Sequence, residues 1–390
     1  MNLRFGIVAG EASGDLLGAG LMAALKARVS CSFEGICGPA MIGQGGVSRY
    51  PMENLAVMGI SEVVGHLPRL LRMRRDLIEY FSDTRPDCII GIDAPDFTLA
   101  LERALKKQGI PVVHYVSPTV WAWRRGRVKT VAKSADLLLA LFPFEPPYYA
   151  GKMEAQFVGH PLADVIGSST DTARARTELR LDTDGLIIAL LPGSREGELK
   201  AHAELFVKTA IRLNLRYPGC RFIAPFVNRE TRALFDEALT AHRAFDLPVT
   251  RLHGHARLAM AAADIVLVAS GTAALEAALI GRPMVVVYRL SGLSYRLIRI
   301  LSRLDYYSLP NHLVGRQLVP ELIQHQATAD HLVRSAERLI EDPAARLEIT
   351  RELSKIRETL RCGANDRAAE AVLNLIHVDC PPVAAVSCGS

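Results

Sequence analysis

The chain has 390 residues, of which 49% are hydrophobic and 22% are charged, and its net charge is +5. This length favours two domains over a single core. The small positive charge is no argument for a nucleic-acid partner, although it favours an anionic membrane surface or phosphorylated ligands. Seven cysteines without a Cys-x-x-Cys pair indicate a reducing cytoplasm and no zinc site. The sequence shows no signal peptide, and no apolar run reaches the roughly 18 residues of a membrane span.

The first predicted strand, over residues 3–9, leads into a glycine-containing turn. The turn reads Gly-Glu-Ala-Ser-Gly-Asp at 10–15, and a helix is predicted from there to about residue 28. This spacing is not the dinucleotide fingerprint Gly-x-Gly-x-x-Gly, which argues against a Rossmann dehydrogenase. A second strand is predicted over 32–36. Residues 38–46 contain four glycines and are predicted as a loop where backbone could approach a ligand closely.

Residues 57–75 combine large apolar side chains with four arginines. One amphipathic helix, broken at Pro68, explains the pattern through an ordinary core-facing stripe. A basic, apolar surface that lies in a bilayer interface explains it equally well. The second interpretation predicts these membrane-facing residues: Val64, Leu67, Arg69, Leu70, Leu71 and Arg72.

Asp93 directly follows a strand predicted over 87–92. Pro95 suits the first position of the next helix and Asp96 its first turn, which leaves Asp93 just outside the helix. In open α/β sheets, ligands and catalytic groups gather at the carboxyl ends of strands. Asp93 is therefore a candidate ligand-binding or catalytic residue, with a turn or capping aspartate as the structural alternative. Strands predicted over 112–116, 137–141 and 156–158 complete a first sheet.

A second strand–helix series follows a polar crossing over residues 162–185. Its strands are predicted near 186–191, 221–224, 248–252, 265–269 and 284–288, and later helices over 330–340, 344–360 and 366–377. The fold class is therefore α/β, with two Rossmann-like, doubly wound domains facing a cleft. The predicted divisions are a membrane-facing domain over 1–165, a domain over 166–345 that contains the sugar-nucleotide site described next, C-terminal helices over 346–378 that pack back toward the first domain, and a loose tail over 379–390.

Residues 264–276 hold the clearest ligand signal in the second half. A buried strand meets a turn of small residues, and a helix then begins, which leaves backbone N–H groups and a positive dipole end for a phosphate. A glutamate one turn into that helix could reach ribose hydroxyls. An ordinary strand–helix connection is the structural alternative. The predicted sugar-nucleotide contacts are Ser270, Gly271, Thr272 and Glu276.

Together these motifs resemble the lipid-A-disaccharide synthases, a family of inverting GT-B glycosyltransferases, from about residue 3 to residue 377. The matching strings are Gly-Glu-Ala-Ser-Gly-Asp at 10–15, Gly-Ile-Asp-Ala-Pro-Asp-Phe at 91–97, Tyr-Val-Ser-Pro-Thr-Val-Trp-Ala-Trp at 115–123, Leu-Pro-Gly-Ser-Arg at 191–195 and Leu-Pro-Asn at 309–311. The resemblance implies transfer of 2,3-diacylglucosamine from UDP to 2,3-diacylglucosamine 1-phosphate (lipid X). The products would be the β-1,6-linked disaccharide 1-phosphate and UDP.

For the site, the resemblance implies that Asp93 removes the proton of the acceptor 6-hydroxyl and that Arg195 pairs with the leaving diphosphate. With that cation and two helix ends, neither a metal nor a cofactor is expected. Further substrate contacts are expected at Glu11, Ser13, Ser194 and Asn311. The protein is expected in the cytoplasm of a Gram-negative bacterium, attached peripherally to the anionic inner membrane. The oligomeric state is left open, with a homodimer as one alternative.

Two rival functions remain. A UDP-sugar 2-epimerase would use the same fold and donor lobe but would need neither a second substrate nor a membrane-facing surface. A non-enzymatic glycolipid carrier would need an apolar pocket but no phosphate-binding turn. Release of UDP only in the presence of a lipid-phosphate acceptor would separate the synthase from both.

Overall fold

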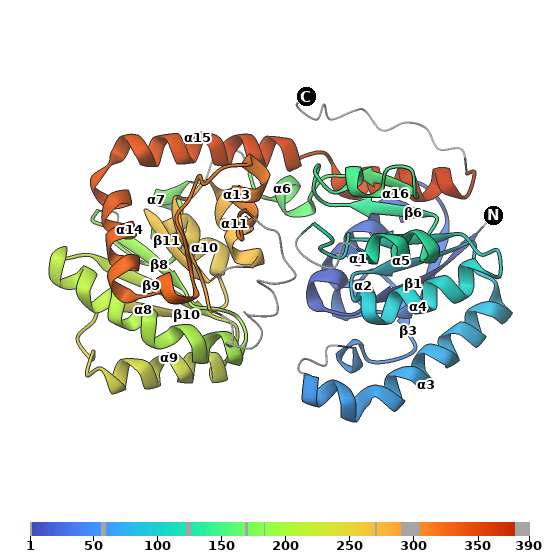
Figure 1. Cartoon of the computed structure of the whole chain (residues 1–390), viewed down its shortest axis with the longest axis horizontal. Helices are drawn as coiled ribbons and strands as arrows, with labels where there is room; N and C mark the ends of the chain where they lie inside the picture. The colour runs from blue at the N-terminus through green and yellow to red at the C-terminus, as the bar shows by residue number, and fades with distance from the viewer. Residues whose placement is uncertain are drawn as a thin grey trace. The chain divides into compact units, whose positions relative to one another are not determined.

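The computed structural model describes residues 2–55, 60–121, 126–167, 171–182, 184–269, 271–289 and 305–378, leaving out the side chains of residues 60–66. The chain forms two compact units, one of Met1–Asp164 with Thr359–Ser390 and one of Val165–Glu358. It therefore leaves the first unit after Asp164, builds the second, and returns to the first for its last helix (Figure 1). The tail predicted over 379–390 lies outside the described residues.

The first unit is built on a seven-stranded parallel sheet in the order β3-β2-β1-β4-β5-β6-β7. Its strands are β1 (Leu3–Ala9), β2 (Cys31–Ile36), β3 (Gly46–Ser48), β4 (Cys88–Ile92), β5 (Val112–Tyr115), β6 (Leu137–Ala140) and β7 (Glu154–Phe157). The central strands are buried and apolar, as a parallel sheet with helices on both faces requires. Ala9 pairs with Ile92, so the turns after β1 and β4 are neighbours.

Helices cover both faces of this sheet. They are α1 (Ala12–Lys26), α2 (Pro39–Gly43), α3 (Ile60–Thr84), α4 (Pro95–Lys106), α5 (Arg127–Ser134), α6 (Pro161–Val165) and α16 (Ala364–Leu375), with short 3-10 turns η1 (Met52–Asn54) and η2 (Pro146–Tyr149). The chain moves from β1 to β2 in one direction and from β4 to β5 in the other, so right-handed crossovers place α1 and α4 on opposite faces. Helices α2 and α16 contact α1, whereas α3 and α5 contact α4.

The late helix α16 is an integral part of the first unit. The carboxylate of Asp164 accepts hydrogen bonds from the backbone N–H groups of Gly363 (2.9 Å) and Ala364 (2.7 Å) and so caps the start of α16. Farther along the helix, Asp366 forms an ion pair with Arg28 at the end of α1, 2.8 Å away. These contacts join the last described segment to the first helix of the chain.

The second unit is built on a six-stranded parallel sheet in the order β10-β9-β8-β11-β12-β13. Its strands are β8 (Ile187–Leu191), β9 (Arg221–Phe226), β10 (Val249–His253), β11 (Ile265–Ala269), β12 (Met284–Tyr288) and β13 (Glu321–Ile323). Its helices are α7 (Thr172–Glu178), α8 (Glu196–Arg216), α9 (Arg229–Ala241), α10 (Ala256–Ala262), α11 (Thr272–Ile280), α13 (Leu309–Val314), α14 (Ala329–Glu341) and α15 (Pro343–Leu360), with the 3-10 turn η3 (Gln324–Gln326). The predicted class, two doubly wound α/β sheets with a helical C-terminus, is confirmed.

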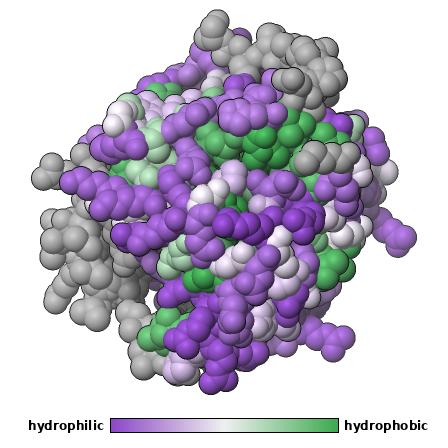
Figure 2. All heavy atoms as spheres, turned by 90° about the vertical axis from the view of Figure 1, so that its right-hand side faces the viewer, coloured by the Kyte–Doolittle hydropathy of each residue, from purple (hydrophilic) through white to green (hydrophobic). Residues whose placement is uncertain are grey.

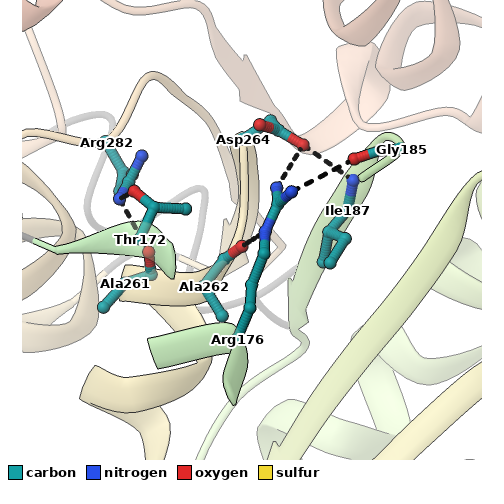
Figure 3. A network of polar contacts seen from close by, with 8 residues as sticks. All are labelled: Thr172, Arg176, Gly185, Ile187, Ala261, Ala262, Asp264 and Arg282. Atoms are coloured by element: carbon teal, nitrogen blue, oxygen red, sulfur yellow. Dashed lines mark hydrogen bonds and ion pairs between the residues drawn. The ribbon is translucent and has the colours of Figure 1, made fainter. Parts of the chain in front are cut away.

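A buried polar network closes the amino edge of the second sheet (Figure 3). Arg176 of α7 is 6% exposed and pairs with the carboxylate of Asp264, just before β11, at 2.9 Å. The same carboxylate accepts the backbone N–H of Ile187 at the start of β8 (2.8 Å). Arg282 donates to the hydroxyl of Thr172 at the start of α7. The polar crossing predicted over 162–185 therefore contains a helix that is fixed to the sheet by a buried arginine paired with a partly buried aspartate.

The prediction of a loop over residues 38–46 is wrong, because α2 and the start of β3 lie there. Asp15 supplies the physical reason. Its carboxylate accepts the backbone N–H groups of Ala40 (2.8 Å) and Met41 (3.0 Å), and so satisfies the free end of a helix of only five residues. A helix stabilised from a distant part of the chain leaves little trace in its own sequence.

The predicted break at Pro68 is also wrong, since α3 runs without interruption from Ile60 to Thr84. A proline inside a helix removes one backbone hydrogen bond, a cost that tertiary packing can offset. The buried side chains of Met73, Leu77 and Phe81 recur every four residues and provide that packing in the second half of α3.

Large apolar side chains are seldom exposed on the described surface, and the face shown in Figure 2 is mostly hydrophilic. No helix among the described residues is both long enough and apolar enough to cross a bilayer.

Candidate functional site

In each sheet the chain adds strands first on one side of its first strand and then on the other side. The strand order therefore reverses between β1 and β4 in one sheet and between β8 and β11 in the other. Open α/β sheets bind ligands at the carboxyl ends of strands at such reversals. The residues singled out in the sequence gather there: Glu11 and Ser13 follow β1, Asp93 follows β4, Ser194 and Arg195 follow β8, and Gly271, Thr272 and Glu276 follow β11. Ser270 follows β11 as well, but lies outside the described residues. Each unit therefore has its own candidate site.

Asp93 occupies a left-handed turn between β4 and α4. Asp93 and Ala94 have φ angles of 51° and 45°, which non-glycine residues adopt seldom and mostly where surrounding structure imposes them. The backbone N–H of Asp93 donates to the carbonyl of Tyr115 (2.9 Å), and the Thr98 hydroxyl donates to the carbonyl of Asp93 (2.8 Å). The Asp93 carboxylate is partly exposed and receives no hydrogen bond from the described residues. Its backbone is fixed while its carboxylate stays available, which is the arrangement that a general base needs.

The start of α1 lies beside this turn. Glu11 is the N-cap residue of α1 and is partly buried, and Ser13 is exposed in the first turn of the helix. Both stay predicted substrate contacts. Asp15, in the same motif, is 4% exposed and uses its carboxylate to cap α2. The motif therefore supplies one structural carboxylate and two side chains that can face a ligand.

A buried carboxylate that the sequence analysis missed supports the loop after β5. Glu145 is 2% exposed, and its carboxylate accepts the backbone N–H groups of Leu141 and Phe142, each at 3.1 Å. Burial raises the pKa of Glu145 to about 8. Hydrogen bonds from these two N–H groups and from the side chains of Trp121 and Ser117 lower the pKa, but by less than burial raises it. Ser117 and Trp121 lie far from Glu145 in the chain, and no local pattern in the sequence distinguishes this glutamate.

The loop that Glu145 supports contains strained backbone. Val116 has a φ of 82°, which is a clear outlier for a β-branched residue. The hydroxyl groups of Ser117 and Tyr149 lie 2.9 Å apart and fix the loop on its buried side. Strand β5 is the neighbour of β4, so this loop stands one strand away from Asp93. The strain is held at the carboxyl edge of the sheet, where the candidate base lies.

In the second unit, the helix end after β8 is already capped from within. The carboxylate of Glu198 accepts the backbone N–H groups of Ser194 (2.8 Å) and Arg195 (3.4 Å). Gly193 makes this possible, because a Cβ there would lie 2.4 Å from the Cβ of Glu198 and its φ is 136°. The main chain of Ser194 is therefore used inside the protein, and the predicted phosphate contact reduces to the exposed side chains of Ser194 and Arg195.

The helix end after β11 is different. Gly271, the N-cap residue of α11, has a φ of 138° and open space where a Cβ would be, and no side chain of the described residues caps the helix. Thr272 is exposed beside it. Glu276 lies in the second turn of α11 with 20% of its side chain exposed. Of the two helix ends at this reversal, α11 is the one open to an anion.

The side chain of Asn311, a predicted ligand contact, is used inside the protein. It is fully buried, and its Oδ1 accepts the backbone N–H groups of Leu318 and Val319, both at 2.8 Å. Its Nδ2 donates to the Val319 carbonyl and to the Glu321 carboxylate, also at 2.8 Å. Every hydrogen-bonding position of the amide is thus occupied, and Asn311 joins α13 to the segment that enters β13.

The membrane-facing prediction concerns α3. Leu67 and Leu71 are 46% and 42% exposed, Leu70 is partly buried, and both Arg69 and Arg72 are exposed. The side chain of Val64 lies outside the described residues. The exposed leucines lie off the buried stripe described above, so α3 has both a core-facing side and an exposed apolar one.

On the other helices of the same unit, Leu16 of α1 (64%) and Ile42 of α2 (50%) are exposed as well, and Val47 of β3 is 58% exposed. The chain neighbours of the first two, Asp15 and Met41, are hydrogen-bonded to each other across α1 and α2. Both helices begin at the carboxyl edge of the sheet, as α3 does. No group of three metal-ligating side chains occurs in the part of the chain that the structure describes.

A family model described as lipid-A-disaccharide synthetase matches residues 5–375 of this chain. The lipid-A-disaccharide synthase of Methylobacillus flagellatus is 50% identical over 374 residues, which cover 95% of this chain and 99% of the relative. The protein of the same name from Pseudomonas aeruginosa is 49% identical over 376 residues, covering 96% and 98%.

Two solved structures illustrate the fold relation. The UDP-GlcNAc 2-epimerase of Neisseria meningitidis, bound to UDP-GlcNAc, has a TM-score of 0.62 at 15% identity and covers 97% of this chain and 100% of its own. HepE of Anabaena, in complex with UDP and glucose, has a TM-score of 0.58 at 14% identity and covers 96% and 100%. Identities this low show the fold alone.

Proposed function

Because this chain belongs to the lipid-A-disaccharide synthase family, we propose that its first unit binds the lipid acceptor and its second unit the nucleotide donor. Members of this family are glycosyltransferases that use a UDP-linked sugar and lipid X. The rival function of a UDP-sugar 2-epimerase has only the distant fold relation in its favour, and nothing specific supports a carrier.

The observation that carries the donor assignment is the uncapped N-terminus of α11 at the strand reversal of the second sheet. Its free N–H groups and dipole suit the diphosphate of UDP-diacylglucosamine. Arg195 follows β8, the strand next to β11, and its guanidinium can pair with phosphate oxygens bidentately. Glu276 would accept hydrogen bonds from ribose hydroxyls. Similar folds crystallised with UDP support a nucleotide in this role.

In the first unit, Asp93 would remove the proton from the 6-hydroxyl of lipid X. The resulting oxygen attacks the anomeric carbon of the donor sugar, the bond to the diphosphate breaks, and UDP leaves with its added negative charge. Attack from the face opposite the leaving group inverts the anomeric centre and gives the β-1,6 linkage. The α11 dipole and Arg195 stabilise the charge that develops on the diphosphate, so the step is proposed to proceed without a metal. Glu11 and Ser13, beside Asp93, would orient the acceptor.

Both substrates carry acyl chains, so the protein must meet a bilayer. The exposed apolar side chains on the first three helices of the first unit, with Arg69 and Arg72 beside them, support a membrane-facing surface there. This surface lies on elements that begin at the same sheet edge as Asp93. The proposed location is the cytoplasmic side of the inner membrane of a Gram-negative bacterium, with peripheral attachment.

The test is release of UDP from UDP-diacylglucosamine with and without lipid X. Release that requires lipid X, together with a disaccharide product by mass spectrometry, would support the proposal. Release without acceptor, or change of the donor sugar at C2, would point to the epimerase instead. Binding of either lipid with no turnover would favour the carrier.

A further inference from the structure

Glu276, the proposed ribose contact, is hydrogen-bonded inside the protein. Its Oε2 accepts a hydrogen bond from Nε of Arg257 at 2.9 Å. Glu276 is 20% exposed and Arg257 is 44% exposed, so the pair lies at the surface of the second unit. Among the described residues no second group donates to this carboxylate, which leaves Oε1 for a ligand.

The position of the pair relates it to the donor site. Arg257 is the second residue of α10, which follows β10, and Glu276 is the fifth residue of α11, which follows β11. Both helices begin at the carboxyl edge of the sheet, and the two helices contact each other. The ion pair therefore lies about one turn from the open end of α11, where α10 and α11 meet.

An ion pair as exposed as this one contributes little to folding stability. Its main physical effect is on orientation. A glutamate has three side-chain torsions, and a free carboxylate must lose that freedom when it binds a ligand. A hydrogen bond from a guanidinium Nε to one oxygen fixes the plane of the carboxylate in advance. The other oxygen is then presented in a single direction.

We propose that Arg257 is a positioning residue of the donor site: it holds Glu276 so that the free carboxylate oxygen accepts a hydrogen bond from a ribose hydroxyl of a nucleoside diphosphate. This inference rests on the proposed function, because it assumes that a nucleotide binds at the end of α11. Nothing in it requires Arg257 to touch the ligand.

The test compares binding of UDP and 2′-deoxy-UDP by calorimetry to the parent protein and to Arg257→Gln, Arg257→Lys and Glu276→Gln. The parent should prefer UDP. Arg257→Gln should weaken UDP binding by roughly 2- to 12-fold, the range for one side chain that is no longer ordered in advance, with little change for 2′-deoxy-UDP. Arg257→Lys should restore part of the preference. In turnover, Arg257→Gln should raise the donor KM and leave kcat nearly unchanged.

Arg251 provides a matched control. It belongs to the same unit and pairs with Asp236 at 3.0 Å, close to the 2.9 Å of the Arg257–Glu276 pair, and the two side chains are 39% and 37% exposed. Unlike Arg257, it lies within β10 and not at the start of a helix. Arg251→Gln should keep both affinities. If it reduced UDP binding as much as Arg257→Gln does, the effect would be a general one of surface charge, and the proposal would be wrong.

The remaining outcomes separate this inference from the proposed function. A parent protein that binds no UDP would overturn both. A parent that binds UDP and 2′-deoxy-UDP equally would remove the ribose role of Glu276, and the positioning role with it. Equal weakening of both nucleotides by Arg257→Gln would assign Arg257 to the diphosphate instead. An unchanged preference in Arg257→Gln, with Glu276→Gln losing it, would leave the donor site intact and refute the role of Arg257 alone.

Discussion

A Cβ atom on Gly10 would lie 2.4 Å from the Cβ of Ala94. The turn after β1 can pack against the turn after β4 only because Gly10 has no side chain. Ala94 is the N-cap residue of α4 and follows Asp93 directly. The close approach therefore joins the motif that contains Glu11 and Ser13 to the left-handed turn that positions the candidate base.

Replacing Gly10 with alanine should displace this turn and lower transfer at least about 10-fold, since catalysis is sensitive to displacements of about an ångström. UDP affinity should not change, because the proposed donor site belongs to the other unit. Steady-state rates and calorimetry would check the two parts. Gly14→Ala is the control, since a Cβ there meets nothing nearer than 3.5 Å. Equal loss in both variants would show that the motif is sensitive to any added methyl group.

Replacing Asp93 with asparagine should reduce turnover by at least about 10²-fold, the usual contribution of a general base, while UDP still binds. Asparagine keeps the size of the side chain and removes its capacity to accept a proton. Asp96→Asn is the matched control, because Asp96 belongs to the same motif, is 84% exposed and pairs with Arg127. Near-normal turnover in a folded Asp93→Asn protein would transfer the base role to another residue.

Replacing Arg195 with alanine should weaken UDP binding by about 1–3 kcal/mol, as loss of a charged hydrogen bond does. The loss should be larger at low ionic strength, because salt screens an exposed charge pair. Calorimetry over a salt series would measure it. Arg212→Ala, on the same helix and paired with Asp330 at 2.7 Å, should have no such effect. Identical salt dependence in both variants would argue against a phosphate contact at Arg195.

Replacing both Leu67 and Leu71 with serine should reduce binding to anionic vesicles and leave the melting temperature close to that of the parent. The two side chains are 46% and 42% exposed, so they contribute to the core only in part. Vesicle sedimentation and thermal unfolding would measure the two quantities. The control is Leu215→Ser with Phe245→Ser, which are 76% and 72% exposed in the other unit. Unfolding of the α3 variant, or unchanged vesicle binding, would make α3 an ordinary core helix.

Replacing Glu145 with glutamine should flatten the dependence of stability on pH. The pKa of Glu145 is raised to about 8 in the folded protein from 4.5, so the folded state holds the proton more tightly. Its contribution to stability is therefore complete below pH 4.5 and is lost as the pH rises toward 8, at about 1.4 kcal/mol per unit. Chemical denaturation from pH 5 to pH 9 should show that the free energy of unfolding of the parent falls relative to that of the variant. A constant difference would mean that Glu145 is ionised in the fold.

Much of the fold was readable from the sequence because its strands are continuous apolar runs between turns. The predicted strand over 265–269 coincides with β11, and the placement of Asp93 outside α4 is confirmed. Such local patterns depend only on neighbouring residues. By contrast, α2 depends on a carboxylate from α1, and β13, of three residues, is an edge strand too short to show a pattern.

The sequence predicts where most of the candidate site residues lie in the fold, but it predicts less well which hydrogen bonds they make. The sequence places Ser194 and Asn311 in plausible motifs, but it cannot show that Glu198 and the segment 318–321 occupy their hydrogen-bonding groups. It also gives no means of finding Glu145 or Arg257, since their roles depend on residues brought near by folding. Partners across the chain decide which polar groups remain for a ligand.

The capping of α16 by Asp164 has a consequence for synthesis. The second unit, Val165–Glu358, is complete in the emerging chain before the residues of α16 have been made. Until then, α1 lacks the helix that covers Gly20, where a Cβ would lie 2.6 Å from the side chain of Asn365. The second unit can therefore finish folding on the ribosome first. The unit that holds Asp93 must wait for α16, and until α16 is made the surface of α1 that it covers stays exposed.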